Sequence, residues 1–190
     1  PLVEPLQEAT GLAMLLDNGA KTLGQAEVWY GAGRGSRNAV VALIGTGVGA
    51  SIIVDGKTYR GANSSAGEWG HTKVVVNGRI CRCGARGCLE AYVGGQSIIE
   101  RYLEAVPGAN HHHRHDEEAT LAGLLAEAQS SAAARQVIDV SVDYIGAGLA
   151  NLINLFNPDK IILAGWAGML LGRQFMTAIR DATAKHALAH

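Results

Sequence analysis

The sequence contains few cysteines, few charged residues and no long apolar run, and each shortage excludes a class of protein. Its three cysteines cannot all pair with one another, which argues against a secreted disulfide framework. Lys and Arg are scattered in a chain of net charge -1, so the basic surface typical of nucleic-acid binding is missing. The longest apolar run, Tyr144–Phe156, is too short to cross a bilayer, and no signal peptide is visible. We therefore expect a cytoplasmic protein without a membrane contact.

What the chain does contain is enough apolar material for a substantial core. It has 190 residues, of which 48% are hydrophobic, so we expect one domain, or one domain with a small appendage. The sequence begins at Pro1 rather than Met, and we interpret it as a fragment of a longer protein.

The first third of the chain predicts strands and one helix. The apolar run Leu12–Asp17 favours a short buried strand. Asn18 is a good cap for a helix that continues to Trp29 and ends at a group of glycines. Two β-rich runs flank the glycine turn Gly45–Gly49, and Asp55-Gly56 supplies a second tight turn, which together indicate a β-hairpin system.

The rest of the chain predicts one more strand, then mainly helices, and finally a strand and a helix. Residues 72–78 are typical of a strand that ends in an Asn-Gly turn, and residues 160–165 of a buried parallel strand. Apolar residues at helical spacing and terminal signals predict helices over 95–106, 117–128, 134–156 and 172–190. This order indicates a mixed α/β chain without internal repeats. We interpret His111–His115 as part of a polar loop.

All three cysteines lie within one segment that also contains a histidine. The ligand spacing is His71, then Cys81 and Cys83, then Cys88. One imidazole and three thiolates form a set that favours tetrahedral Zn²⁺, and four protein ligands leave no open position for catalysis. We therefore predict a structural zinc site. The alternative is a group of buried or free cysteines without a metal.

At this segment the sequence resembles the ROK family, which groups bacterial sugar kinases and sugar-responsive transcriptional repressors. "GEWGH" at Gly67–His71 is similar to the family's Glu-x-Gly-His motif. "CRCGARGCLE" at Cys81–Glu90 is similar to its Cys-x-Cys-Gly-x-x-Gly-Cys-x-Glu signature. The stretches "WYGAGRG", "IGTGVGASIIVDG" and "NLINLFNPDKIILAG" extend the resemblance over nearly all of residues 1–190. The resemblance implies an actin-like, ribonuclease-H-like ATPase fold, of which this chain would be mostly the C-terminal lobe.

The resemblance also implies a sugar site next to the metal. Glu68 and Glu90 would accept hydrogen bonds from sugar hydroxyls, and Asn18 would belong to the same site. His71 would contact the sugar with one ring nitrogen and bind zinc with the other. Zinc would hold the loop so that Glu90 is positioned before the sugar arrives. Without the resemblance, both glutamates would be interpreted as solvated surface charges.

The catalytic base of the family's kinases is missing from the expected position. The resemblance places an Asn-Asp motif at Asn18 and Gly19, so the asparagine is kept and the aspartate is replaced by glycine. Asp17 is nearby but lies on the other side of Asn18. Residues two apart in an extended chain are displaced by about 7 Å, which is too far for a substitute base.

The nucleotide motifs are also altered. Gly45, Thr46 and Gly47 form a turn that can hold a phosphate, although such a turn is more often a simple hairpin. Ala50 and Ser51 follow where the family's kinases usually continue with glycines. Trp166 stands in the glycine-rich turn where the resemblance places adenosine. These departures disfavour ATP and Mg²⁺ as ligands.

Three functions are compatible with these residues. The favoured one is the sugar-sensing effector and oligomerisation domain of a ROK-type regulator, with no enzymatic activity. Such a protein would bind a sugar or sugar phosphate, would form a homodimer or homotetramer through its helices, and would contact DNA only through an N-terminal winged-helix domain absent from this chain. The alternatives are an ATP-dependent sugar kinase and a zinc-stabilised interaction module without a ligand.

Overall fold

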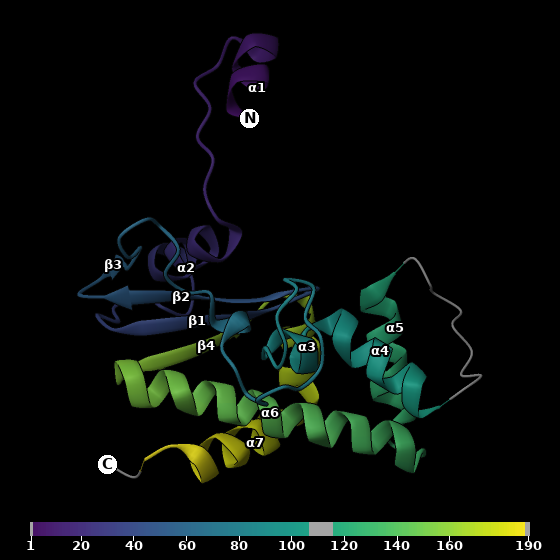
Figure 1. Cartoon of the computed structure of the whole chain (residues 1–190). Coiled ribbons are helices and arrows are strands. Elements are labelled where there is room, and N and C mark those ends of the chain that lie inside the picture. Colours follow the sequence, from purple (N-terminus) through teal and green to yellow (C-terminus); the bar gives the residue numbers. More distant parts are fainter. Residues whose placement is uncertain (1, 107–115, 189–190) are drawn as a thin grey trace.

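The structure, a computed structural model, describes residues 2–106 and 116–188 (Figure 1). It is a mixed α/β fold, as the sequence predicts. The strands are β1 (Ala39–Ile44), β2 (Val48–Val54), β3 (Lys57–Thr58) and β4 (Lys160–Ala164). The helices are α1 (Val3–Thr10), α2 (Gly19–Tyr30), α3 (Glu90–Val93), α4 (Gly95–Ala105), α5 (Glu117–Glu127), α6 (Ala132–Phe156) and α7 (Trp166–His186), with the 3-10 helix η1 (Trp69–His71).

The strands form one mixed sheet in the order β3-β2-β1-β4. β1 pairs antiparallel with β2 and parallel with β4, so the predicted hairpin and the predicted parallel pairing are both confirmed. Figure 1 shows α2 on one face of the sheet, and α6 and α7 on the other. Val40, Val41 and Ala42 of β1 are completely buried because neighbouring strands and helices cover this strand on all sides.

The long helix α6 runs below the sheet in Figure 1 and packs along α7. Its ends agree with the sequence: the Ser131 hydroxyl accepts a hydrogen bond from the Ala134 amide, and Asn157 adopts a left-handed conformation. A Cβ on Gly146 would lie 2.5 Å from the Ala182 side chain, so glycine permits the close approach of the two helices. Among the described residues, no helix combines the length and apolar character needed to span a bilayer.

Two predicted strands are wrong. Residues 12–17 form an extended segment without strand pairing, and Leu15 is fully exposed. An apolar run becomes a strand only when another strand pairs with it, and the described part of the chain supplies none here. Residues 72–78 form only an isolated bridge between Lys73 and Cys88, because a turn at Asn77 (φ 58°) bends this segment back toward the cysteines.

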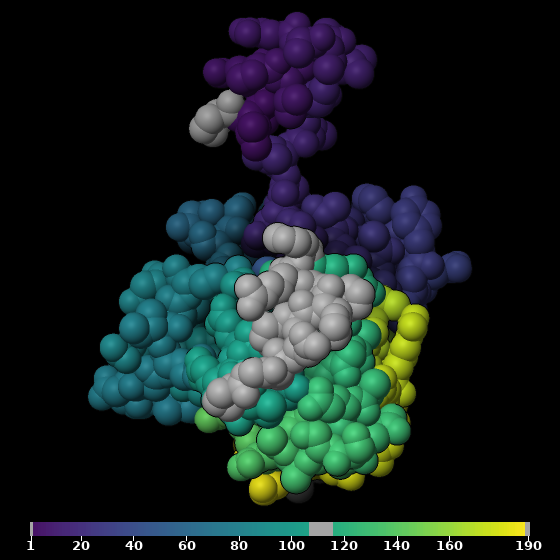
Figure 2. Space-filling view, turned by 90° about the vertical axis from the view of Figure 1, so that its right-hand side faces the viewer, coloured from purple at the N-terminus to yellow at the C-terminus, as the bar shows by residue number. Residues whose placement is uncertain are grey.

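Three smaller differences concern the ends of the chain and its last strand. β4 is mostly half-exposed rather than buried, since it is an edge strand among the described residues. Helix α7 begins at Trp166, before the predicted start at residue 172. The sequence did not predict α1, which projects away from the body in Figures 1 and 2 and has no buried residue. His111–His115 lie outside the described residues.

Candidate functional site

A cavity of about 450 Å³ lies where β1 and β4 end and α2 begins. Ligands of α/β proteins commonly bind beyond the carboxyl ends of parallel strands, because helix N-termini and connecting loops converge there. The residues that line the cavity are Asn18, Ala20, Lys21, Leu43, Gly45, Thr46, Gly47, Val48, Gly49, Gly67, Glu68, His71, Glu90, Gly165 and Trp166. All residues that the sequence predicts to bind sugar or phosphate therefore line the same cavity.

Glu90 is a buried carboxylate in a fixed position. It begins α3, and only about a tenth of its side chain is exposed. Its Oε2 accepts a hydrogen bond from the Val48 amide (2.9 Å), which joins the cysteine segment to the start of β2. Its Oε1 lies 3.8 Å from the Arg82 guanidinium. These contacts orient the carboxylate in the cavity wall before any ligand binds.

Glu68 differs from Glu90 because about half of its side chain (53%) is exposed. It directly precedes η1, and the buried Trp69 anchors this turn through a hydrogen bond from Nε1 to the Gly148 carbonyl (3.0 Å). Gly67 has φ 92°, and a Cβ there would lie 2.1 Å from the Ala50 carbonyl oxygen, so only glycine fits. The backbone around Glu68 is thus fixed, while its carboxylate remains available to a ligand.

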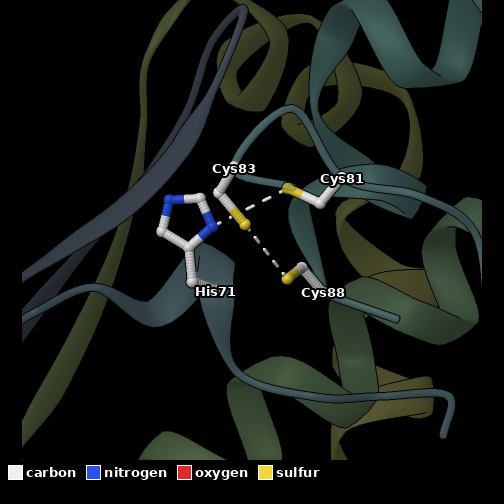
Figure 3. A group of neighbouring side chains, drawn as sticks. All are labelled: His71, Cys81, Cys83 and Cys88. Carbon is white, nitrogen blue, oxygen red and sulfur yellow. Dashed lines mark hydrogen bonds between the residues drawn. The ribbon is translucent and has the colours of Figure 1, made fainter. Parts of the chain in front are cut away.

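His71, Cys81, Cys83 and Cys88 converge as the sequence predicts (Figure 3). Their ligand atoms all lie within 4.8 Å of one another. The Cys83 and Cys88 sulfur atoms are 3.8 Å apart, and so are His71 Nδ1 and Cys81 Sγ. A tetrahedral zinc ion with Zn–S bonds of about 2.3 Å places neighbouring sulfur atoms about 3.8 Å apart. The geometry therefore fits a tetrahedral metal ion, and this group of residues could hold one.

The two ring nitrogens of His71 face different neighbours. Nδ1 faces the cysteine sulfurs, as Figure 3 shows, while Nε2 lies 3.9 Å from the Glu68 carboxylate. His71 also lines the cavity. One nitrogen thus faces the possible metal ligands, and the other lies on the side of Glu68.

The cysteines differ in how easily they lose a proton. Burial raises the pKa of the Cys81 thiol to about 12, whereas a backbone hydrogen bond from Ala85 lowers the pKa of Cys83. The Lys73 ammonium donates to the Cys88 sulfur at 2.8 Å, and this contact raises the pKa of Lys73. Because a metal binds thiolates rather than thiols, metal affinity at this site should increase with pH.

The turn Gly45–Gly47, which could hold a phosphate, is in contact with side chains that the sequence did not predict there. The Thr46 hydroxyl donates to the Glu117 carboxylate (2.6 Å), which places a negative charge on the turn. The Trp166 indole packs against glycine backbone: a Cβ on Gly95 would lie 2.2 Å from the ring, and one on Gly45 would lie 3.3 Å from Nε1. Glu117 is far from Thr46 in the sequence. The sequence predicts only that Glu117 lies in the first turn of a helix, which is α5.

The start of α2 contains no carboxylate that could act as a base in the cavity. Gly19 is the first residue of the helix, and the Asn18 side chain caps it by accepting from the Ala20 and Lys21 amides. Asp17 makes two hydrogen bonds with Arg60 (3.0 and 2.5 Å), which lower the pKa of Asp17 to about 2, and it does not line the cavity. Since capping uses the Asn18 amide oxygen, its NH₂ group is left to face a ligand.

Lys21 is a cavity residue that the sequence analysis missed. It lies in the first turn of α2 and is only 3% exposed. Within the ranges that the structure describes, its ammonium makes neither a hydrogen bond nor an ion pair. The only signal in the sequence is its position three residues after the predicted cap Asn18, which places it on the first helical turn.

Comparison with known proteins is consistent with this site. The family model described as "ROK family" matches residues 1–190. The chain belongs to the ROK family. A glucokinase from Halalkalibacterium halodurans is 36% identical over 172 residues, which cover 87% of this chain and 52% of the relative. The DNA-binding transcriptional repressor Mlc of Escherichia coli is 33% identical over 86% of this chain and 40% of its own length.

A ROK hexokinase from Thermus thermophilus has the same fold. Its crystal structure superposes with a TM-score of 0.82 at 27% identity and covers 98% of this chain and 60% of its own. The chain thus spans about half the length of the curated relatives that it matches. The family therefore contains both kinases and regulators among the relatives of this chain, and family membership alone does not choose between them.

Proposed function

We propose that this chain is the sugar-sensing effector and oligomerisation domain of a ROK-family transcriptional regulator. The observation that carries the proposal is that one cavity combines the expected sugar-binding residues with the absence of the expected catalytic aspartate. Glu68, His71 and Glu90 line it, while Gly19 stands at the helix start where the resemblance places the catalytic aspartate. A kinase needs a base for the attacking hydroxyl, whereas a sensor needs only the binding groups.

In this proposal the sugar is held by groups that the fold has already oriented. Glu68 and Glu90 accept hydrogen bonds from sugar hydroxyls, and the Asn18 NH₂ donates one. The ligand stabilises one arrangement of two lobes or of a homodimer or homotetramer, and this changes the spacing of the DNA-reading elements in a separate N-terminal domain. Such a regulator works in the cytoplasm.

Zinc is the metal that we propose for His71, Cys81, Cys83 and Cys88. A bound zinc ion supplies folding energy and rigidity, because four protein ligands complete its tetrahedral shell. Cys88 and Glu90 are close in the sequence, so a fixed Cys88 also fixes the start of α3 and the Glu90 carboxylate. The cysteine segment therefore positions a binding group and takes no part in chemistry.

A sugar kinase is the second candidate, since glucokinases are among the relatives and the Gly45–Gly47 turn is retained. The Glu117 carboxylate on Thr46, the Trp166 indole and Gly19 count against it. A zinc-stabilised module without a ligand is supported less, because both Glu68 and Glu90 line the same cavity.

A thermal-shift screen of the full-length, zinc-loaded protein tests the proposal. The panel contains hexoses, N-acetylhexosamines, pentoses and their phosphates, each with and without Mg-ATP. We expect one sugar type to raise the melting temperature, and by the same amount with and without Mg-ATP. A shift with ATP that grows when sugar is added would contradict the proposal and favour the kinase.

A further inference from the structure

Lys73 brings a positive charge to the cysteine sulfurs. Its ammonium donates a hydrogen bond to Cys88 Sγ (2.8 Å), and its charge also interacts with the sulfurs of Cys81 and Cys83. Among the described residues, no arginine and no other lysine donates a hydrogen bond to a cysteine sulfur. The arginines of the same segment have oxygen partners instead: Arg79 pairs with Glu104, Arg82 with Gln96 and the Thr46 carbonyl, and Arg86 with the Gly78 carbonyl.

The backbone places the Lys73 side chain next to Cys88. The two residues face each other in an isolated antiparallel bridge. On either side of the bridge, the amides of Val74 and Leu89 each donate to a carbonyl of the opposite segment (2.9 Å in both cases). Lys73 and Cys88 are therefore a non-hydrogen-bonded pair, the position of an antiparallel ladder at which opposite side chains lie closest together. The contact thus follows from the register of the backbone and does not depend on a free choice of side-chain rotamer.

The group that Lys73 contacts is buried and negatively charged when it holds a metal. Cys88 is 0% exposed and Cys81 is 2% exposed. Three thiolates and a neutral imidazole around a divalent ion leave one negative charge on the site as a whole. Glu90 Oε1, at 3.5 Å from Cys81 Sγ, brings a carboxylate close to the same group. Because a buried charge is costly unless an opposite charge lies nearby, this site favours a neighbouring cation.

We propose that Lys73 is the charge partner of the metal site. Its ammonium balances the negative charge that three thiolates leave on the site, and its hydrogen bond holds Cys88 Sγ in place. Lys73 is a positioning residue and not a metal ligand, because an ammonium has no lone pair to donate. Groups that hold metal ligands from outside typically change metal affinity by about 10- to 100-fold. This inference rests on the zinc proposed for the cysteine segment and is independent of the ligand that the cavity binds.

Zinc release from the full-length, zinc-loaded protein to an excess of a colour-forming chelator tests this inference. The variants Lys73→Met and Lys73→Gln remove the charge, and Lys73→Arg keeps it. We expect both neutral variants to release zinc about tenfold or more faster than the wild-type protein, and Lys73→Arg to stay within about threefold of it. Lys57→Met is the matched control, because Lys57 is an exposed lysine of β3 and should leave the release rate unchanged.

The absorption spectrum of the cobalt-substituted protein supplies a readout that a merely structural role of Lys73 would not move. A hydrogen bond and a positive charge at Cys88 Sγ stabilise the electrons of the sulfur. We therefore expect the thiolate-to-cobalt charge-transfer band to shift to lower energy in Lys73→Met and Lys73→Gln. The band should keep its wild-type position in Lys73→Arg and in Lys57→Met.

The outcomes separate this inference from the other proposals. Equal release rates and an unchanged cobalt band in the neutral variants would overturn the role of Lys73 and leave both the zinc site and sugar sensing intact. Fast release from Lys73→Arg as well would overturn the role of its charge. Wild-type protein that binds neither zinc nor cobalt would contradict the zinc proposal together with this one, whereas sugar sensing is tested separately by the thermal shift.

Discussion

Glu68 and Glu90 are the same residue type in two environments, and their substitutions should have different consequences. Glu90 is buried and is bonded to the Val48 amide, so it contributes both to the fold and to the cavity. Glu68 is half exposed, and its neighbour at 3.9 Å is His71. The loss of a carboxylate at Glu68 therefore tests ligand binding without disturbing the core.

Glu68→Gln should weaken sugar binding and leave stability unchanged. A hydrogen bond to a charged acceptor contributes about 1.5–3 kcal/mol, so we expect an affinity loss of about tenfold or more. Titration calorimetry and thermal melting measure the two effects separately. Glu4→Gln in the exposed helix α1 is the matched control. Equal affinity of Glu68→Gln and the wild-type protein would remove Glu68 from the site.

Ser51 offers a second test at the residue scale. Among the described residues, its Oγ is the buried side-chain polar atom without a hydrogen-bond partner. It lies against α2, since a Cβ on Gly24 would be 2.1 Å from this oxygen. Ser51→Ala should raise the free energy of unfolding by about 1 kcal/mol, because it removes an unpaired buried hydroxyl.

The control for this prediction is Ser141→Ala. Ser141 is also buried, but its hydroxyl donates to the Val137 carbonyl (2.7 Å) and accepts from Arg101 (2.9 Å). The same substitution there should lower stability, since it leaves the Arg101 donor with one partner fewer. Chemical denaturation compares both variants with the wild-type protein. A lower stability of Ser51→Ala would show that Ser51 has a partner such as an ordered water.

At the scale of elements, the cysteine segment shows what spacing predicts and what it does not. The sequence predicted the convergence of His71 and three cysteines correctly, because few other arrangements satisfy closely spaced thiols and an imidazole. It predicted a strand over residues 72–78, whereas this segment forms only an isolated bridge. The turn at Asn77 and the bridge to Cys88 depend on contacts that local propensity does not contain.

Cys83→Ser should release zinc and destabilise the fold. Cys83 is exposed, so the substitution itself removes little packing, and most of the effect must come from the metal. We expect a loss of several kcal/mol, on the order of what structural zinc contributes, together with a large fall in melting temperature. Metal analysis and thermal melting measure both. Wild-type protein treated with a chelator is the control and should behave like the variant.

Unchanged melting and unchanged metal content in Cys83→Ser would contradict the structural zinc site. An unchanged melting temperature with complete loss of metal would show that the metal binds without supporting the fold.

In the other elements too, the sequence predicts what local signals determine and misses what depends on long-range contacts. The helix after Asn18 and the hairpin around Gly45–Gly49 were predicted because capping and turn residues act locally. The exposure of β4 was not predicted, because the edge position of a strand depends on the whole sheet. Lys21 was missed for a related reason: its burial results from contacts between α2 and the strands that no local pattern encodes.

At the scale of the whole molecule, the cavity is assembled from segments that are distant in the sequence. The start of α2, the turn after β1, the turn at η1, the cysteine segment and the start of α7 each contribute to its lining. The chain spans about half the length of its relatives, and its N-terminal helix projects from the body with no buried residue (Figures 1 and 2). The binding and catalytic properties of the whole protein must therefore be measured on the full-length chain.

Restoring a carboxylate at the start of α2 should restore a trace of kinase activity in the full-length protein. A Cβ on Gly19 meets no atom within 4 Å, so Gly19→Asp fits without strain, and an aspartate in the first helical turn is favourable. Gly19→Asn has nearly the same shape without the charge and is the matched control. Activity in the asparagine variant as well would contradict a role for the carboxylate as the base.

The most direct test of the central claim is ADP release by the wild-type full-length protein, measured with Mg-ATP and saturating amounts of a sugar that it binds. The claim is that the cavity binds sugar without transferring a phosphoryl group to it. We predict no ADP release above the level without sugar. Sugar-dependent ADP release at ordinary kinase rates, about 1–100 per second, would contradict the claim and show that the protein is a sugar kinase despite Gly19.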